Sequence, residues 1–303
     1  MSGDARRIGI DYGGTTTKII VIEGALDAPS VVHRSTFPTP RGEGALDRLA
    51  SEVRAVVPEG VESGGVTVPG VLDDDRGLVV RSVNLPWLDG LEFGVELSDR
   101  LGYGIRPVHD GRAAAGAEAS LGAGRGFADS FVIALGTGVA GAYVEGGVVR
   151  RGAHGAAGEI GHITQDPLGR PCTCGQRGCL ETFIGGAHLA ERWTARSGRP
   201  ASARDLFDAA RAGDRIAAGI ADEVSTALAR GILGVIASFD PSVIVIGGGI
   251  ATADDLVVAP TVQKVRDAST FHAHPPILRA ELGPWAGAWG AALAARDVGV
   301  LHG

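Results

Sequence analysis

The amino-acid sequence predicts an α/β protein made of two related lobes. Residues 8–22 and 131–149 share one pattern, in which a turn rich in Gly and Thr joins two apolar, strand-like runs. Two copies of one supersecondary unit indicate two related domains. Helical patterns lie between the strands, which favours layers of helices packed on sheets. Because no low-complexity linker separates the halves, we expect two lobes joined by a hinge.

The elements of the first half follow from the spacing of its apolar residues. The strand pair at 8–22 precedes residues 44–57, where apolar side chains recur at the intervals of an amphipathic helix. The β-branched runs at 66–72 and 77–83 predict strands. Residues 111–122 are rich in alanine and predict a further helix.

The second half of the chain places glycines at the ends of its strands. Residues 131–135 predict a buried strand, and the run VIVIGGGI at 243–250 predicts another, which ends in three glycines. A ligand crevice is expected at the carboxyl end of such a strand. A long helical pattern covers residues 216–239, and an alanine-rich helix is expected near 286–297.

Gly136, Gly138 and Gly141 spell G-x-G-x-x-G, the pattern of a dinucleotide-binding turn. That fingerprint needs a helix to begin at the glycines, so that the helix N-terminus receives the pyrophosphate. Here apolar residues continue after the glycines as a second strand and a turn. We therefore reject a Rossmann interpretation.

Composition excludes several classes of protein. The chain has 303 residues, 45% hydrophobic and 21% charged, so it can bury a full core and is not a disordered chain. The net charge is −7 and no block of five like charges occurs, which argues against a nucleic-acid or membrane-surface partner. No apolar run is long enough to cross a bilayer and no leader-like segment precedes the first strand, so we expect a cytoplasmic protein.

The segment DYGGTTTK at 11–18 has the chemistry of a phosphate-binding turn. Glycine lets backbone N–H groups approach phosphate oxygens that a Cβ would block, and threonine hydroxyls donate further bonds. Asp11, at the end of the first strand, would hold Mg²⁺ or one of its waters. The candidate phosphate contacts are Gly13, Gly14, Thr15, Thr16 and Lys18. The alternative is an ordinary glycine-rich hairpin, and the spacing is not that of a Walker A loop.

Two further glycine loops are candidates for the same nucleotide. LGTGVAG at 135–141 repeats the character of the first turn, and GGGI at 247–250 suits a platform for the nucleotide base. The candidate contacts are Gly136, Thr137 and Gly138 in the former and Gly248 and Gly249 in the latter. The alternatives are a glycine bulge in a sheet and a tight strand-to-helix turn.

All three cysteines of the chain fall within the segment CTCGQRGC. An odd number of closely spaced cysteines argues against disulfides and fits one tetrahedral Zn²⁺ held by Cys172, Cys174 and Cys179. A closed zinc site needs a fourth ligand, and His162 is the nearest histidine upstream. The alternative is a surface loop with reduced, unligated thiols.

Polar residues beside the cysteines are candidates for a polyhydroxyl ligand. A bound metal would hold its loop rigidly and so pre-organise Glu159, His162 and Glu181 as hydrogen-bond partners. If one ring nitrogen of His162 binds metal, the other is free for a hydroxyl. For the two glutamates the alternative is solvated surface charge.

Asp110 follows the extended segment PVH and precedes an expected helix. The structural explanation for an aspartate at this position is a helix N-cap. The functional explanation makes its carboxylate the base that accepts a substrate hydroxyl proton during phosphoryl transfer. The two explanations are compatible.

The order of these motifs resembles the ROK family of sugar kinases, within the actin, hexokinase and Hsp70 superfamily. The resemblance covers nearly the whole chain, and its most specific part is the zinc signature. The motifs that carry it are DYGGTTTK at 11, VPG at 68–70, NLPW at 84–87, LGTGVAG at 135, GEIGH at 158 and CTCGQRGCLE at 172–181.

The resemblance implies a two-lobed actin-like ATPase (ribonuclease H-like) fold with mixed central sheets and an interlobe cleft. Residues 1–112 plus 286–303 would form the small lobe, with the first phosphate hairpin and the catalytic Asp110 at the hinge. Residues 113–285 would form the large lobe, with the second hairpin, the zinc site and the adenosine loop. Relatives are commonly dimers, so we expect a homodimer.

The resemblance also implies a reaction, in which the γ-phosphoryl group of ATP passes to a primary hydroxyl, usually O6, of a hexose-like ring. Its cofactors would be ATP, Mg²⁺ and structural Zn²⁺, with Asp110 as the base and His162 completing the zinc site. The residues implied to bind the sugar are Asn84, His109, Glu159, His162 and Glu181.

One residue departs from the family pattern. The family usually has Asn immediately before the catalytic Asp, and this chain has His109. Histidine differs from an amide in reach and in titration. The change suits an amino sugar such as kanosamine or a sugar-like cyclitol, both of which are substrates of relatives in antibiotic biosynthesis.

Two other functions remain as alternatives. Some ROK relatives are sugar-responsive repressors, which carry a winged helix-turn-helix ahead of the first strand, and only seven residues precede Ile8 here. A kinase that uses polyphosphate would share the phosphate loops, although the sequence has no evident basic track for a long polyanion.

Overall fold

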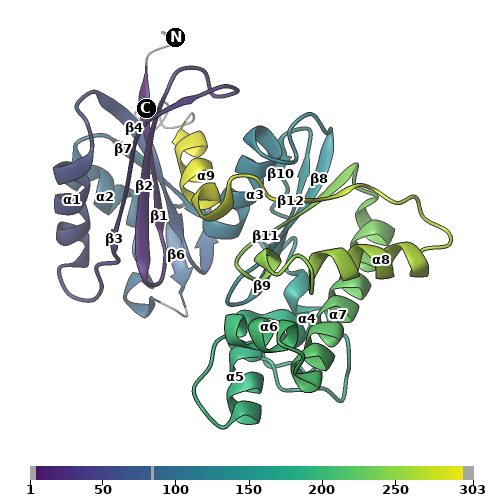
Figure 1. Cartoon of the computed structure of the whole chain (residues 1–303). Coiled ribbons are helices and arrows are strands. Elements are labelled where there is room, and N and C mark those ends of the chain that lie inside the picture. Colours follow the sequence, from purple (N-terminus) through teal and green to yellow (C-terminus); the bar gives the residue numbers. More distant parts are fainter. Residues whose placement is uncertain (1–4, 83–84, 296–303) are drawn as a thin grey trace. The chain divides into compact units, whose positions relative to one another are not determined.

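The computed structural model describes residues 5–82 and 85–295 (Figure 1). The chain divides into two compact units, the first made of Met1–Gly122 and Pro284–Gly303 and the second of Ala123–Gly283. Each unit contains a five-stranded sheet with parallel and antiparallel neighbours, covered by helices. The predicted α/β class with mixed sheets is therefore confirmed.

The sheet of the first unit has the order β3-β2-β1-β4-β7. Antiparallel pairs join β1 to β2 and β2 to β3, whereas β4 runs parallel to both β1 and β7. The elements of this unit are β1 (Arg6–Tyr12), β2 (Thr16–Glu23), β3 (Ser30–Pro38), α1 (Ala45–Val56), β4 (Val61–Val68), β5 (Val71–Asp73), β6 (Leu78–Arg81), the 3-10 turn Pro86–Leu88, α2 (Phe93–Leu101), β7 (Gly104–His109), α3 (Asp110–Leu121), the 3-10 turn Gly283–Trp285 at its second boundary and α9 (Ala286–Ala294).

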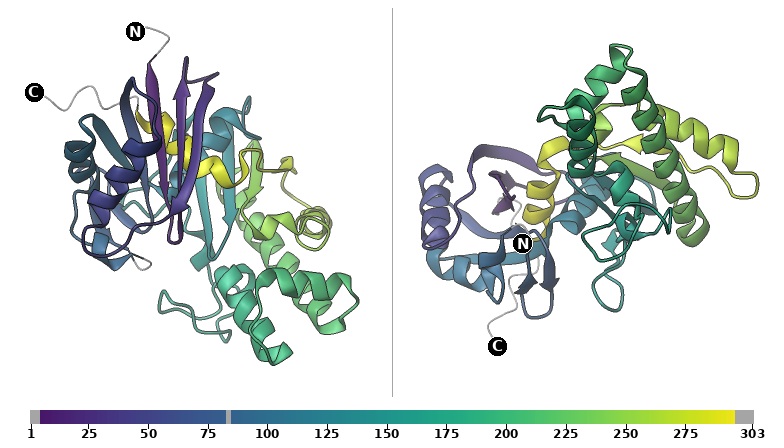
Figure 2. Two further views of the ribbon diagram at one scale, coloured as in Figure 1. Left: turned by 60° about the vertical axis from the view of Figure 1, so that its left-hand side comes forward. Right: turned by 90° about the horizontal axis from the view of Figure 1, so that it is seen from below.

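The two faces of this sheet are covered in different ways. Apolar residues of α1 and α2 pack on one face, in a cluster that includes Leu49, Val53 and Leu97. Helix α9 lies on β1 and β4. Figure 2 shows this helix, in yellow, beside the purple strands of the sheet. Glycines allow this close approach, because a Cβ on Gly9 would lie 1.9 Å from the Ala288 carbonyl oxygen. A larger residue there would push α9 off the sheet.

The sheet of the second unit has the order β10-β9-β8-β11-β12. Strand β8 is antiparallel to β9 and parallel to β11, which places the carboxyl ends of β8 and β11 side by side. The elements of this unit are β8 (Asp129–Leu135), β9 (Val139–Glu145), β10 (Val148–Val149), the 3-10 turn Ile160–His162, α4 (Leu180–Ile184), α5 (Gly186–Ser197), α6 (Ala203–Arg211), α7 (Arg215–Phe239), β11 (Val243–Gly247), the 3-10 turn Ile250–Thr252, α8 (Val258–Ala268) and β12 (Ile277–Arg279).

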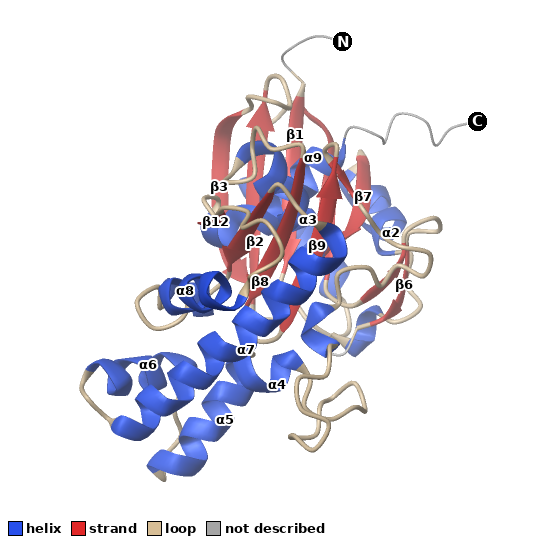
Figure 3. Ribbon diagram, turned by 90° about the vertical axis from the view of Figure 1, so that its right-hand side faces the viewer, coloured by secondary structure: helices blue, strands red, loops and turns tan. Residues whose placement is uncertain are grey.

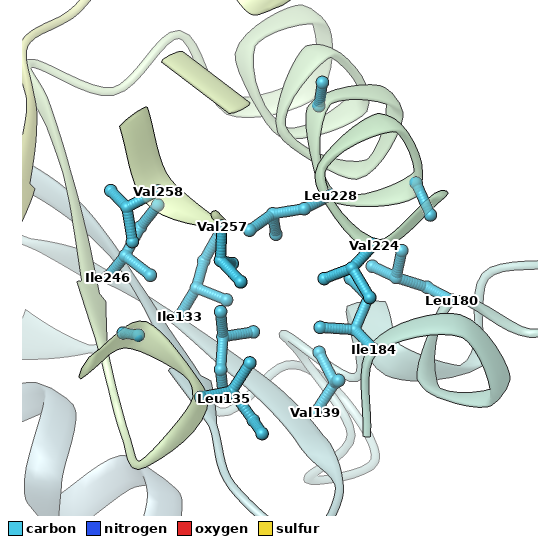
Figure 4. Packing of buried hydrophobic residues seen from close by; sticks show 14 of the residues in the cluster. Ile133, Leu135, Val139, Leu180, Ile184, Val224, Leu228, Ile246, Val257 and Val258 are labelled. Carbon is cyan, nitrogen blue, oxygen red and sulfur yellow. The ribbon is translucent and has the colours of Figure 1, made fainter. Parts of the chain in front are cut away.

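The core of the second unit lies between its sheet and the long helix α7. Ile133 and Leu135 of β8 point towards Val224 and Leu228 of α7, with Ile184 of α4 beside them (Figure 4). Helices α4 and α6 pack on α7, and α5 packs on α4 and α6 (Figure 3). This packing holds the turn after β8 on a rigid support.

Most of the predicted elements are confirmed, and one differs in an instructive way. The stretch at 66–72 is not one strand, because β4 ends at Val68 and β5 begins at Val71. Pro69 has no N–H to donate to a ladder, and Gly70 has a φ of +121°, which β-branched residues avoid. The rejection of a Rossmann turn is confirmed, because the glycines after β8 lead into β9.

Candidate functional site

The first phosphate hairpin is the turn between β1 and β2. Thr15 and Thr16 are exposed, whereas Thr17 is fully buried. The turn is supported from beneath by Thr39, whose hydroxyl donates to the Gly13 carbonyl at 2.7 Å and whose N–H donates to the Thr15 carbonyl at 2.9 Å. The exposed hydroxyls and backbone of the turn are thus held ready for an anion.

Asp11 lies at the end of β1, just before this turn. Its Oδ2 accepts from Lys18 Nζ on β2 at 3.1 Å, and its Oδ1 accepts from the Thr67 hydroxyl on β4 at 3.0 Å. The first turn of α9 closes the third side, because a Cβ on Gly287 would lie 2.7 Å from Oδ1. The carboxylate therefore has one fixed orientation.

Asp110 is the first residue of α3, and His109 is the N-cap of this helix. The expectation that Asp110 itself caps the helix is wrong, because the chain enters the helix one residue earlier. His109 Nδ1 accepts from the Arg112 N–H at 3.4 Å, and Asp110 Oδ1 accepts from the Gly111 N–H at 2.7 Å. Two neighbouring side chains thus share the free N–H groups of one helix start.

The electrostatic surroundings of Asp110 favour its neutral form. Loss of hydration among the surrounding protein raises the pKa of its carboxyl, although 48% of the side chain still meets solvent. The electrostatic interaction with His109 and the hydrogen bond from Gly111 act to lower this pKa, and the charge of Asp11 acts to raise it. A raised pKa moves a carboxyl toward the range of a useful general base.

Asn84, predicted to bind the sugar, lies outside the described residues. The segment VPG at 68–70 ends β4 and leads into the β5–β6 pair. A Cβ on Gly70 would lie 2.3 Å from the Arg81 carbonyl oxygen, so this position requires glycine for space as well as for its φ.

The second phosphate hairpin is the turn between β8 and β9. Its carbonyls are held by the start of α5, since the Gly186 N–H donates to Gly136 at 2.9 Å and the Ala187 N–H donates to Thr137 at 3.1 Å. Gly136 and Thr137 are exposed. The turn thus rests on a helix and presents its outer edge to solvent.

Glu181 lies against this second hairpin. Its Oε2 accepts from the Val139 N–H at 2.8 Å, and a Cβ on Gly138 would lie 2.3 Å from the same oxygen. Glu181 is half-buried in the first turn of α4. One candidate sugar ligand is therefore in direct contact with one candidate phosphate loop.

The glycine loop after β11 packs on the end of β8. Gly248 has a φ of +92°, and a Cβ there would lie 2.3 Å from the Leu135 carbonyl oxygen. The chain then turns into a 3-10 helix beginning at Ile250, which is the strand-to-helix turn considered as an alternative. A cavity of about 330 Å³ opens beside Gly249 and Ile250, and Arg211 of α6 lines its other side. This volume falls in the range of small-molecule sites.

The three cysteines and His162 form one cluster. Their ligand atoms all lie within 4.8 Å of one another. Cys172 Sγ is 3.6 Å from His162 Nδ1, and Cys174 Sγ is 3.6 Å from Cys179 Sγ. Tetrahedral Zn²⁺, with Zn–S of about 2.3 Å and Zn–N of about 2.0 Å, sets neighbouring ligand atoms roughly 3.5–3.8 Å apart. The donor set and its spacing therefore fit zinc, with Nδ1 as the histidine ligand and Nε2 left free.

The segment that carries Glu159 packs tightly on β9. A Cβ on Gly158 would lie 2.3 Å from the Gly141 carbonyl oxygen, and one on Gly161 would lie 2.2 Å from the Val139 carbonyl oxygen. Because the backbone of this segment touches the backbone of β9, there is no room for a side chain at either glycine. Glu159 itself is exposed.

In the part of the chain that the structure describes, no helix is both long enough and apolar enough to cross a bilayer.

Similarity to known proteins extends over nearly the whole chain. The sequence profile of the ROK family matches residues 7–298. This chain belongs to the ROK family. The ROK chain described here is 35% identical over 277 residues to a glucokinase of Thermotoga maritima, in an alignment that covers 86% of this chain and 87% of the relative. It is 29% identical over 310 residues to N-acetylgalactosamine kinase AgaK of Shewanella sp. (strain ANA-3), with 97% and 98% covered.

A solved ROK structure has the same fold. The ROK family glucokinase from Streptomyces griseus, in complex with glucose and AMPPNP, matches with a TM-score of 0.82 at 30% identity, covering 96% of this chain and 99% of that one. The expectation of an actin-like ATPase fold is thereby confirmed for this ROK protein.

Sequence reasoning missed the residues that support the first hairpin and Asp11. Thr39, Thr67 and Gly287 come from segments remote in sequence from the turn that they contact. Weak signals existed, because Thr67 stands at the start of a predicted strand and Gly287 stands at the start of the alanine-rich helix. Neither signal says which other segment lies next to it.

Proposed function

We propose that this chain, an ATP-dependent sugar kinase of the ROK family, phosphorylates a primary hydroxyl of a hexose or hexose-like ring with Asp110 as the general base. The observation that carries the assignment of the base is the carboxylate at the start of α3, whose pKa is raised by its surroundings and whose second oxygen is not engaged by the Gly111 N–H. Such a group accepts a proton more readily than an ordinary carboxylate does.

In the proposed reaction Asp110 accepts the proton of the sugar hydroxyl as that oxygen bonds to the γ-phosphorus of ATP. The bond between the γ-phosphorus and the bridging oxygen breaks, and ADP leaves. The proton on Asp110 then passes to solvent. The protein supplies position and charge rather than a covalent intermediate, as in other phosphoryl transfers.

We assign nucleotide binding to the three glycine loops. The exposed threonines of the first hairpin and the exposed edge of the second would hold the phosphates. The cavity of about 330 Å³ beside Gly249 would take the base, and Arg211 is kept at its wall by two hydrogen bonds to Asp255, at 2.9 and 2.7 Å. Asp11 would hold Mg²⁺ or one of its waters, and the ion would offset the negative charge of the phosphates.

Sugar binding is assigned to Glu159, His162, Glu181 and His109. Structural zinc would fix His162 through Nδ1 and leave Nε2 for a ring hydroxyl. Both a glucokinase and an N-acetylgalactosamine kinase are among the relatives, so a neutral hexose and an amino sugar are both chemically reasonable acceptors.

His109 favours an acceptor other than plain glucose. Its Nδ1 already accepts from the helix backbone, so the ring has one remaining polar atom, Nε2, which in this tautomer is a donor. An amide at this position would offer a donor and an acceptor. An amino sugar such as kanosamine or a C7-cyclitol therefore stays as the alternative substrate class.

A coupled assay of ADP release tests the proposal. Purified protein is offered glucose, mannose, N-acetylated hexosamines, kanosamine and C7-cyclitols, with ATP and then polyphosphate as the donor. Phosphorus NMR of the product identifies the phosphorylated hydroxyl. We expect turnover with ATP on a primary hydroxyl of at least one acceptor, and turnover of none of them would overturn the proposal. The homodimer stays a prediction, for light scattering to test.

A further inference from the structure

The hydroxyl of Thr67 links β1 to β4 at the point where β1 ends. The parallel pairing of the two strands extends to Ile10 opposite Val66. One step further, the Tyr12 N–H donates to Thr67 Oγ1 at 3.0 Å rather than to a backbone carbonyl. The Thr67 hydroxyl thus replaces a backbone carbonyl as the acceptor for this N–H.

The hydrogen bond from Tyr12 to Thr67 determines the direction of the hydrogen bond between Thr67 and Asp11. A hydroxyl has a single proton. The Tyr12 N–H can only donate, so Thr67 Oγ1 is the acceptor in that hydrogen bond. Its own O–H therefore donates to Asp11 Oδ1, at 3.0 Å. Thr67 is fully buried, so water does not compete for this proton.

The position of Thr67 in the sheet places it between two carboxylates of the first unit. Strand β4 lies between β1 and β7, and Thr67 is in register with Val108, two residues before Asp110. Asp11 and Asp110 affect one another electrostatically. The orientation of Asp11 therefore matters beyond its own contacts.

We propose that Thr67 is the positioning residue that orients the Asp11 carboxylate for the nucleotide. The proposal rests on the role of Asp11 in the proposed function. Lys18 alone leaves the carboxylate free to rotate about one hydrogen bond, whereas Lys18 and Thr67 together hold both oxygens. The site then meets the phosphates without reorganisation, which is how a fixed charge contributes most.

The test compares Thr67→Val with Thr67→Ser. Valine keeps the shape and removes the hydroxyl, and we expect kcat to fall about 10- to 100-fold, as for other groups that orient a ligand, with the KM for sugar changed less than about threefold. Serine keeps the hydroxyl and should retain most of the kcat. Thr261→Val removes an equally buried hydroxyl of α8 and should lower only the melting temperature.

A double-mutant cycle with Asp11→Asn identifies the route of the effect. If Thr67 acts through Asp11, Thr67→Val should cause little further loss in the Asp11→Asn background. An unchanged kcat in Thr67→Val, or an equal loss in both backgrounds, would overturn the proposal. Thr67→Ala replaces the valine variant if that variant does not fold.

Calorimetric titration with MgATP repeats the cycle without any sugar. This readout separates the two proposals, because a protein that phosphorylates no tested sugar can still show coupled losses of nucleotide affinity. Additive losses of affinity in the cycle would refute the role of Thr67 even if the enzyme proves to be a kinase.

Discussion

Replacing Asp110 by asparagine should abolish most activity and at the same time stabilise the fold. Asparagine keeps the shape of the side chain and an oxygen that can accept from the Gly111 N–H, which lies 2.7 Å from Asp110 Oδ1. It cannot accept a proton from the sugar. Loss of a general base costs about 10²- to 10⁴-fold in kcat, equivalent to roughly 3–5 kcal/mol of the barrier.

The gain in stability follows from the raised pKa of Asp110. A carboxyl with a raised native pKa binds its proton more tightly in the folded than in the unfolded chain, so its ionisation at neutral pH disfavours folding. This penalty is complete above the native pKa and disappears as the pH falls towards the unfolded value, near 3.8. The Asp110→Asn variant lacks the penalty at every pH.

Chemical denaturation at several pH values, with ADP release at each, measures both effects. We expect the variant to exceed the wild type in free energy of unfolding at pH 7, with the difference shrinking in acid. Asp205 provides a control of opposite sign, because the hydrogen bonds that its carboxylate accepts from Ser202 lower its pKa, and Asp205→Asn should destabilise the fold at pH 7. Full activity in Asp110→Asn, or a loss of stability that persists at all pH values, would refute the reasoning.

Three further predictions concern Asp110, the second phosphate hairpin and the cysteine cluster. In the pH profile of kcat/KM, the midpoint of the acid limb should lie above the ordinary pKa of an aspartate, because Asp110 must be ionised to act as the base. Asp11→Asn should move this midpoint to lower pH, because it removes a charge that raises the Asp110 pKa. Gly138→Ala should lower the melting temperature and weaken ATP binding, because its Cβ would lie 2.3 Å from Glu181 Oε2, whereas Gly136→Ala adds a Cβ to open space and should leave the melting temperature unchanged in the same thermal scan. Metal analysis should find one zinc per chain, and its removal by a chelator should lower the melting temperature, with recovery on adding zinc back.

The sequence was sufficient to predict those features that depend on neighbouring residues. The helix expected at 44–57 is α1, at Ala45–Val56, and the pattern at 216–239 is α7, at Arg215–Phe239. The cysteine spacing likewise predicted a cluster that the structure assembles with His162. In each case periodicity or spacing within one segment carries the information.

Contacts between distant segments could not be predicted in this way. Asp11 and Thr67 are 56 residues apart in sequence, and Val139 and Glu181 are 42 apart. Hydrophobic periodicity specifies which side of a strand is buried, but it does not specify which other strand lies next to it or in what register. The N-cap of α3 also escaped prediction, because aspartate is a preferred N-cap residue whereas histidine, which caps this helix, is not.

The packing of α9 against Gly9 has a consequence for how the protein is made. The second unit is one continuous stretch of chain, whereas the first needs α9, which a ribosome synthesises only after that whole stretch. During translation the second unit can therefore fold before α9 is available to cover β1 and β4 of the first unit. Any premature stop ahead of Ala286 would therefore leave β1 and β4 with a bare apolar face, and such a fragment should be captured by chaperones or degraded.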